Sequence, residues 1–253
     1  MKLSEQKNVN AQYATGANLN RRIGIHEKYS RNKQGFPSWI VSQYAMEPGM
    51  SVLELGCGTG SMWKGVTLPE GCRLTLTDYS EGMLAEARLN TAHLPNVVFG
   101  QVDAQDIPFP DGSCDMVIAN MMLYHVPDIS RALREIRRVL KPGGVFYAAT
   151  YGEHGVVEAV AAMLDMTLEG NHRFTLQNGR EQLERVFGQV EMTCYDDALD
   201  VTDPADLVAY LRSMASMQVL TGVSDEALMD TFRARMVDGV LHLPKEYGMF
   251  ICR

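Results

Sequence analysis

The stretch Val52-Leu53-Glu54-Leu55-Gly56-Cys57-Gly58-Thr59-Gly60 decides the fold predicted for this chain. An apolar run typical of a strand ends in an acidic residue, one more apolar residue and three glycines at alternate positions. Glycines at such a turn allow a sharp bend and let a ligand approach the backbone closely. A loop that binds only phosphate would favour free N–H groups and positive charge, so the carboxylate of Glu54 instead suits a ligand with an amine or a cationic centre.

The nearest alternative is the dinucleotide-binding fingerprint, in which G-x-G-x-x-G follows a strand. In this chain the third glycine, Gly60, falls one position early, and Ser61 stands where the fingerprint has glycine. Short glycine motifs mislead when they stand alone. The segments after the loop therefore have to separate the two interpretations.

Strands and helices alternate from Ser51 onward. The pattern predicts strands at about 51–55, 73–78, 97–102, 115–119 and 144–150, and helices at about 80–90 and 128–140. Further helices are expected at 155–168, 179–187, 204–214 and 225–237, and further strands at 189–195 and 247–252. Such alternation indicates a parallel sheet covered on both faces, with ligands bound beyond the carboxyl ends of its strands.

Polar motifs follow the second, third and fourth predicted strands. Asp78 ends the second strand, about 20 residues after the glycine loop, where a carboxylate can accept both hydroxyls of a ribose. Asp103-Ala104-Gln105 follows the third strand, and Asn120-Met121-Met122-Leu123 follows the fourth. Lys141-Pro142-Gly143-Gly144 stops a helix and turns into the fifth strand.

From about Gly49 to Tyr151, this set of motifs resembles the class I S-adenosylmethionine-dependent methyltransferase superfamily, in particular its small-molecule, type 11-like domains. The resemblance implies a doubly wound, Rossmann-like α/β fold. Its sheet would have seven mostly parallel strands with an antiparallel last strand, and a helical lid would cover it. Residues 1–48 would form an N-terminal arm, and residues 49–253 the methyltransferase domain, with lid insertions at about 152–173 and 196–243.

The resemblance also implies a cofactor, S-adenosyl-L-methionine, which becomes S-adenosyl-L-homocysteine. The glycine loop would hold the methionyl part, Asp78 the ribose and the Asp103 segment the adenine, while the turn after the fourth strand would lie under the sulfonium. The cofactor-binding residues expected on this basis are Glu54, Gly56, Cys57, Gly58, Gly60, Asp78, Tyr79, Met83, Asp103, Ala104, Gln105, Asn120 and Met121.

Methyl transfer is an in-line displacement, so positioning supplies most of the catalysis, and a general base matters only if the acceptor loses a proton early. His125, which follows the fourth strand, and Tyr13, in the N-terminal arm, are the preferred candidates for that base. Arg21 and Arg22 can pair with the methionyl carboxylate or simply face solvent.

The acceptor expected is a small molecule. Several amino-group methyltransferases carry Asn or Asp followed by Pro-Pro-aromatic after the fourth strand, whereas this chain has Asn120-Met121-Met122-Leu123. Methylation of RNA or of a protein side chain remains an alternative, as does a non-catalytic regulator that binds the cofactor. The early third glycine, Glu54 and the Asp103 segment count against an NAD-dependent oxidoreductase.

The composition of the chain limits which partners, metals and cellular locations are expected. A formal net charge of −8 argues against a nucleic-acid partner. Five cysteines without a C-x-x-C pair argue against disulfides and a zinc site, so no metal is expected. No signal-like or membrane-spanning apolar run is seen, which predicts a cytoplasmic protein without a membrane partner. The sequence leaves open the acceptor, the acceptor atom and the oligomeric state.

Overall fold

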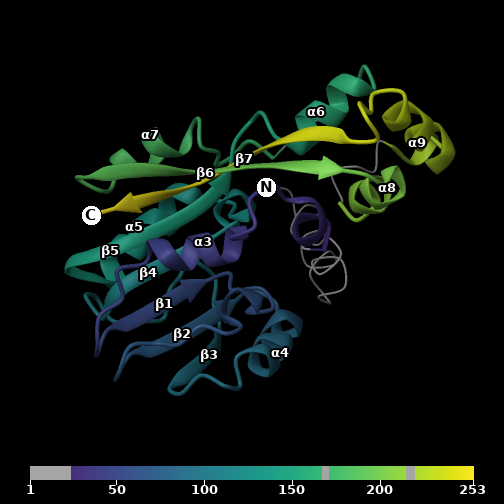
Figure 1. Ribbon diagram of the computed structural model, residues 1–253. Helices are drawn as coiled ribbons and strands as arrows, with labels where there is room; N and C mark the ends of the chain where they lie inside the picture. The colour runs from purple at the N-terminus through teal and green to yellow at the C-terminus, as the bar shows by residue number, and fades with distance from the viewer. Residues whose placement is uncertain (1–23, 167–170, 215–219) are drawn as a thin grey trace.

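A computed structural model describes residues 24–166, 171–214 and 220–253 of the chain (Figure 1). Its centre is a seven-stranded sheet with the order β3-β2-β1-β4-β5-β7-β6. The strands are β1 (Ser51–Leu55), β2 (Arg73–Asp78), β3 (Val97–Gln101), β4 (Cys114–Asn120), β5 (Leu140–Tyr151), β6 (Val190–Val201) and β7 (Leu241–Cys252).

The five strands from β3 to β5 pair in parallel, whereas β7 pairs antiparallel with both β5 and β6. This confirms the predicted fold class, including the antiparallel last strand. The chain runs outward from β1 to β3 and then returns to place β4 on the other side of β1. The strand order therefore reverses between β1 and β4, and in open α/β sheets ligands bind at such a switch point.

Helices cover the sheet and its extension. They are α3 (Phe36–Gln43), α4 (Glu81–Asn90), α5 (Ile129–Val139), α6 (Val156–Met163), α7 (Gly179–Glu184), α8 (Pro204–Arg212) and α9 (Asp225–Arg233), with 3₁₀ turns at Ser61–Trp63 and Leu123–His125. The helix α4 begins where the sequence predicts, because the Ser80 hydroxyl accepts a hydrogen bond from the Met83 N–H at 3.4 Å. The Asp128 carboxylate caps α5 in the same way.

The two faces of the sheet have separate cores, since alternate residues of a strand point to opposite faces. On one face Val52, Leu74, Met116 and Tyr147 pack with Trp39, Ile40 and Trp63. On the other, Leu53, Val117 and Phe146 pack with Leu133 and Ile136 of α5. A third cluster joins α6, α8 and α9 to the far ends of β6 and β7, and Figure 1 shows these helices gathered at that end of the β6–β7 ribbon.

The strands β6 and β7 are longer than predicted, and they extend into the lid insertion expected at about 196–243. The reason is the pairing of Asp197 with Lys245 across the ribbon, where the Lys245 Nζ lies 2.6 Å from the Asp197 Oδ2. The two side chains are only 1% and 0% exposed. Ser30, which follows the helical residues 24–29, donates to the same carboxylate at 2.8 Å and so fixes the preceding segment on the ribbon.

The predicted helix stop at Pro142-Gly143-Gly144 lies inside β5 rather than before it. Leu140 pairs with Cys114 and Val145 with Met116, so the proline and glycines form an irregularity in the ladder. The turn that the sequence predicts is thus present as a bulge, with Gly143 at φ +79°. No helix within the described residues is long and apolar enough to cross a membrane.

Candidate active site

The glycine loop fits closely between the turn after β4 and the helix α4. Gly56, Gly58 and Gly60 all have positive φ, at 68°, 55° and 65°. A Cβ atom on Gly56 would lie 2.8 Å from the Cβ of Met122, and one on Gly60 would lie 3.2 Å from the Cα of Ala87. Both the backbone conformation and the space therefore require glycine, as the alternating motif predicts.

Glu54 is a buried carboxylate without a basic partner among the described residues. It is 2% exposed, and its Oε2 accepts a hydrogen bond from the indole N–H of Trp63 at 2.6 Å. Its Oε1 accepts from the carboxamide of Asn120 at 3.2 Å. Burial raises the pKa of Glu54 to about 7, although the two hydrogen bonds oppose this shift.

Asn120 ends β4 and faces Glu54. Its Nδ2 also donates to the hydroxyl of Tyr44 at 2.7 Å, but its Oδ1 is buried without a hydrogen-bond partner. The Thr59 hydroxyl in the glycine loop is likewise buried and unpartnered. An unsatisfied buried polar atom costs about 1–3 kcal/mol, and the one on Asn120 belongs to a side chain that contacts a carboxylate with no basic partner among the described residues, so a hydrogen-bonding ligand would stabilise this site. A ligand ammonium, with three N–H donors, fits this set of acceptors.

Asp78 lies at the carboxyl end of β2 and is tied to the glycine loop. Its Oδ2 accepts from the N–H of Gly58 at 2.9 Å and its Oδ1 from the N–H of Ser80 at 2.8 Å. Burial raises the pKa of Asp78, and the backbone hydrogen bonds act in the opposite direction. A carboxylate has about four lone-pair positions, so acceptor capacity remains for a ligand hydroxyl. Tyr79, the next residue, is 46% exposed.

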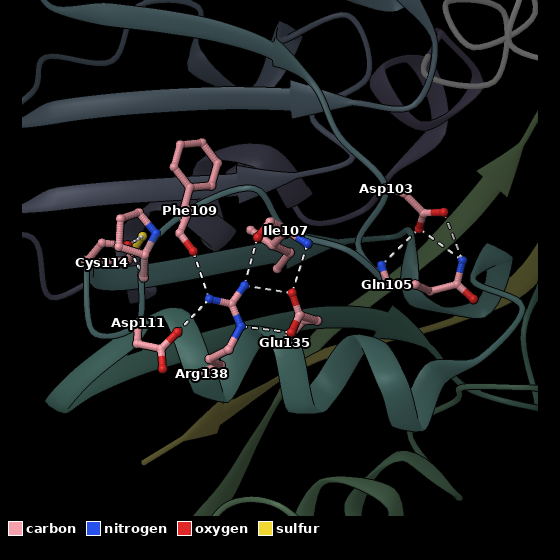
Figure 2. A network of polar contacts seen from close by, with 10 residues as sticks. Asp103, Gln105, Ile107, Phe109, Asp111, Cys114, Glu135 and Arg138 are labelled. Carbon is pink, nitrogen blue, oxygen red and sulfur yellow. Dashed lines mark hydrogen bonds and ion pairs between the residues drawn. The ribbon is translucent and has the colours of Figure 1, made fainter.

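The segment after β3 is held by the helix α5. The Arg138 guanidinium donates to the carbonyls of Ile107 and Phe109 at 2.7 and 2.8 Å. It also pairs with the carboxylates of Glu135 and Asp111, and Glu135 accepts from the Ile107 N–H at 2.9 Å. Figure 2 shows Arg138 at the centre of this network. The loop is therefore fixed along its length by side chains of α5.

At the other end of this loop, Gln105 contacts Asp103 rather than open space. Asp103 accepts from both the backbone N–H and the carboxamide of Gln105, at 2.8 and 2.9 Å (Figure 2). The Gln105 Oε1 accepts from the N–H of Asp128 at 3.0 Å. Ala104 is buried, at 5% exposure.

The other predicted site residues lie in different surroundings. Cys57 is half-buried, and its N–H donates to the Thr77 carbonyl at 2.8 Å. Met121 has a φ of +53°, so the turn after β4 is strained. Met83 is 1% exposed, and its side chain is a core residue. His125 lies in the half-buried 3₁₀ turn, with its ring centroid 4.5 Å from that of Tyr124.

Three predicted residues of the N-terminal arm, Tyr13, Arg21 and Arg22, lie outside the described residues. The structure thus gathers Glu54, the glycine loop, Asp78 and Asn120 at the carboxyl ends of adjacent strands. The Asp103 segment lies at the next strand end along the same edge.

The sequence reasoning missed the aromatic residues around Glu54. Trp63 is fully buried and is a direct partner of the carboxylate, and Tyr44 contacts Asn120. A signal for Trp63 was present, because it is one of only two tryptophans and it follows the glycine loop by three residues. Tyr44 carries no comparable signal, because it lies at helical spacing with Phe36, Trp39 and Ile40, a pattern that indicates packing.

Both the family model that matches this chain and two of its curated relatives are named as methyltransferases. Residues 53–148 match the model of a methyltransferase domain. A sterol 24-C-methyltransferase of Gibberella zeae is 33% identical over 137 residues, or 53% of this chain and 33% of the relative. A demethylmenaquinone methyltransferase of Staphylococcus aureus is 37% identical over 108 residues, or 42% of this chain and 45% of the relative. The chain thus spans less than half of the length of these two curated relatives.

Solved structures share the fold over most of the chain. The [4+2]-cyclase SpnF has a TM-score of 0.60 at 20% identity, covering 97% of this chain and 95% of its own. The YcgJ protein of Bacillus subtilis has a TM-score of 0.58 at 20% identity, covering 85% and 96%. Taken together, the motif order, the sheet topology and the domain match identify residues 53–148 as a methyltransferase domain, and they support the class I S-adenosylmethionine-dependent superfamily for this part of the chain.

Proposed function

We propose that the protein transfers the methyl group of S-adenosylmethionine to a small-molecule acceptor. The observation that carries this proposal is the buried carboxylate of Glu54, which has no basic partner among the described residues and lies beside the unpartnered Oδ1 of Asn120. An amino-acid ammonium would pair with the carboxylate and satisfy the amide oxygen. A nicotinamide dinucleotide offers no such group at this end of the glycine loop, so this set favours the methionyl cofactor.

The remaining residues fit the other parts of the cofactor. Asp78 has acceptor capacity left for the ribose hydroxyls, and Asp103 offers a carboxylate to the exocyclic amine of adenine. When bound, the sulfonium supplies an already activated methyl group. The role left to the protein is to hold the acceptor in line with that group and to exclude water from the site.

The acceptor side of the proposal rests on the residues beside Asn120. The rings of Tyr124 and Tyr151 lie 4.7 Å apart between centroids. The Tyr151 hydroxyl donates to the Asn171 carbonyl at 2.7 Å, and the Asn171 carboxamide donates to the Tyr124 carbonyl at 2.8 Å. These contacts join the ends of β4 and β5 to the segment after α6. They form an aromatic, hydrogen-bonding wall suited to a small organic molecule.

The lid proposed at about 152–173 and 196–243 has apolar side chains that an acceptor could contact. Five methionines are only partly buried against its core: Met163, Met166, Met214, Met229 and Met236. Flexible thioethers adapt to irregular apolar ligands, which supports an acceptor with a sizeable apolar part. The net charge of −8 gives no support to a nucleic-acid acceptor. The names of the two curated relatives, a sterol and a demethylmenaquinone methyltransferase, favour the same class.

The first experiment is calorimetric titration with S-adenosylmethionine, S-adenosylhomocysteine and NAD. We expect micromolar binding of both adenosyl ligands, no binding of NAD, and loss of binding in Asp78→Ala. Binding of NAD instead, or of no ligand, would overturn the proposal. Labelled-methyl transfer to hydroxylated apolar small molecules then tests turnover separately. That separation matters because SpnF, a [4+2]-cyclase, shares this fold.

His125 and Tyr13 remain the proposed candidates for a general base. Replacement of His125 by alanine should leave cofactor binding intact and slow transfer if the acceptor must lose a proton. The pH dependence of kcat gives the second readout, because loss of a base removes the acidic limb of the profile.

A further inference from the structure

The loop that follows β3 contains a carboxamide whose position is fully determined by its neighbours. The Oε1 of Gln105 faces the N–H of Asp128, which can only donate, at 3.0 Å. The Nε2 must then face the other way, where it contacts both oxygens of Asp103 at 2.9 and 3.1 Å. The two contacts leave no freedom to exchange the nitrogen and oxygen of the amide.

This arrangement controls the orientation of the Asp103 carboxylate. The terminal torsion of an aspartate is broad, so an unbraced carboxylate rotates easily. Here the Oδ1 accepts from the backbone N–H and the carboxamide of Gln105, at 2.8 and 2.9 Å. The Oδ2 accepts only the longer contact from the same carboxamide. Within the described residues, Oδ2 is therefore the oxygen of Asp103 with acceptor capacity left for a ligand.

We propose that Gln105 is a positioning residue that turns the free acceptor of Asp103 toward the exocyclic amine of adenine. This inference rests on the proposed function, and it replaces the expectation that Gln105 itself contacts the ring. The N-terminus of α5 supplies the fixed point, because the N–H of Asp128 holds the carboxamide in place. Selectivity for adenine over hypoxanthine then depends on a residue that does not touch the base.

A double-mutant cycle separates positioning from direct contact. The variants are Gln105→Ala, Asp103→Ala and the double variant, and the probes are S-adenosylhomocysteine and S-inosylhomocysteine, which has hypoxanthine in place of adenine. In the wild-type background, Gln105→Ala should weaken the binding of S-adenosylhomocysteine by about 5- to 20-fold, the scale of one or two hydrogen bonds. In the Asp103→Ala background, the same substitution should lower the affinity for this ligand by less than about twofold. Binding of the inosyl ligand should hardly change in either background.

A second variant distinguishes positioning of Asp103 from a simple tie between the loop and α5. Gln105→Glu keeps an acceptor for the Asp128 N–H, at a helix N-terminus where negative charge is favourable. It also replaces the donor to Asp103 by a second carboxylate. If Gln105 only ties the loop to α5, this variant binds like the wild type. If Gln105 positions Asp103, the variant loses adenine selectivity at least as severely as Gln105→Ala.

The outcomes are distinct. Additive losses in the cycle, wild-type behaviour of Gln105→Glu, or no effect of Asp103→Ala would each overturn the proposal while leaving cofactor binding by the wild type intact. Failure of the wild type to bind S-adenosylhomocysteine would instead overturn the proposed function. Exposed Gln34, in the loop before α3, supplies the matched control. Its replacement by alanine should change neither affinity nor selectivity.

Discussion

Replacing Glu54 by glutamine is expected to make the ligand-free protein more stable and unable to bind its cofactor. The carboxylate is buried, and its pKa is raised from 4.5 to about 7. Between these values the folded protein holds a proton that the unfolded chain releases, so stability falls as the pH rises. The loss begins near pH 4.5 and is complete once the pH passes about 7. At 1.36 kcal/mol per unit, the full loss is about 3 kcal/mol.

A glutamine at this position removes the titration and keeps the shape. Its oxygen can accept from the Trp63 indole as Oε2 does now. Asn120 can turn its amide so that the unpartnered Oδ1 accepts from the new carboxamide. The Glu54→Gln protein should therefore exceed the wild type in free energy of unfolding by about 3 kcal/mol at pH 8 and by less than about 1 kcal/mol at pH 5.

The assay is urea unfolding of both proteins at the two pH values, with calorimetric titration of S-adenosylhomocysteine at pH 8. Other titrating groups are common to the two proteins, so they cancel in the difference. A stability difference that does not change with pH would refute the linkage. Wild-type affinity in the variant would refute the assignment of Glu54 to the ammonium of the cofactor.

Three further changes test other parts of the structure. Gly56→Ala should lower the free energy of unfolding by about 2–4 kcal/mol more than Gly65→Ala, measured in urea, because both glycines have positive φ but only the first would clash. Arg138→Met should lower the melting temperature by about 4–8 °C, from about 2 kcal/mol of lost hydrogen bonds, while exposed Arg137→Met leaves it unchanged. Lys245→Met should cost about 3–5 kcal/mol in urea unfolding, since it leaves its buried carboxylate partner unpaired, and a small loss would mean that water reaches the pair.

Four of the five parallel strands could be predicted from the sequence to within one residue at each end, whereas β5 begins four residues before its predicted start. The strands Ser51–Leu55 and Arg73–Asp78 have the predicted bounds, because each is apolar and ends in a turn signal that needs no tertiary information. The β6–β7 ribbon could not be predicted in the same way. Aspartate is uncommon in strands, so the local sequence around Asp197 indicates a loop. In the structure Asp197 lies within β6, where it pairs with Lys245 of β7.

The candidate site shows the same division. The motif positions Glu54, Asp78 and Asp103 were predicted, since each stands at a strand end with a recognisable spacing. The hydrogen bonds that orient these side chains come from residues far along the chain. Asn120 donates to Glu54, and the N–H of Asp128 donates to Gln105, which in turn contacts Asp103. No periodicity in the sequence reports which side chains meet in this way.

The partners that hold the proposed cofactor residues come almost entirely from one continuous stretch of the chain. Trp63 steadies Glu54, and Arg138 fixes the loop after β3. Both lie within residues 53–148, the part that matches the methyltransferase domain. The helices α6, α8 and α9 instead pack in a cluster of their own on the ends of β6 and β7. If these helices form the proposed lid over the acceptor, we expect that a graft of the lid from a related methyltransferase changes the molecule that is methylated while the donor is bound as before, measured by labelled-methyl transfer and calorimetric titration.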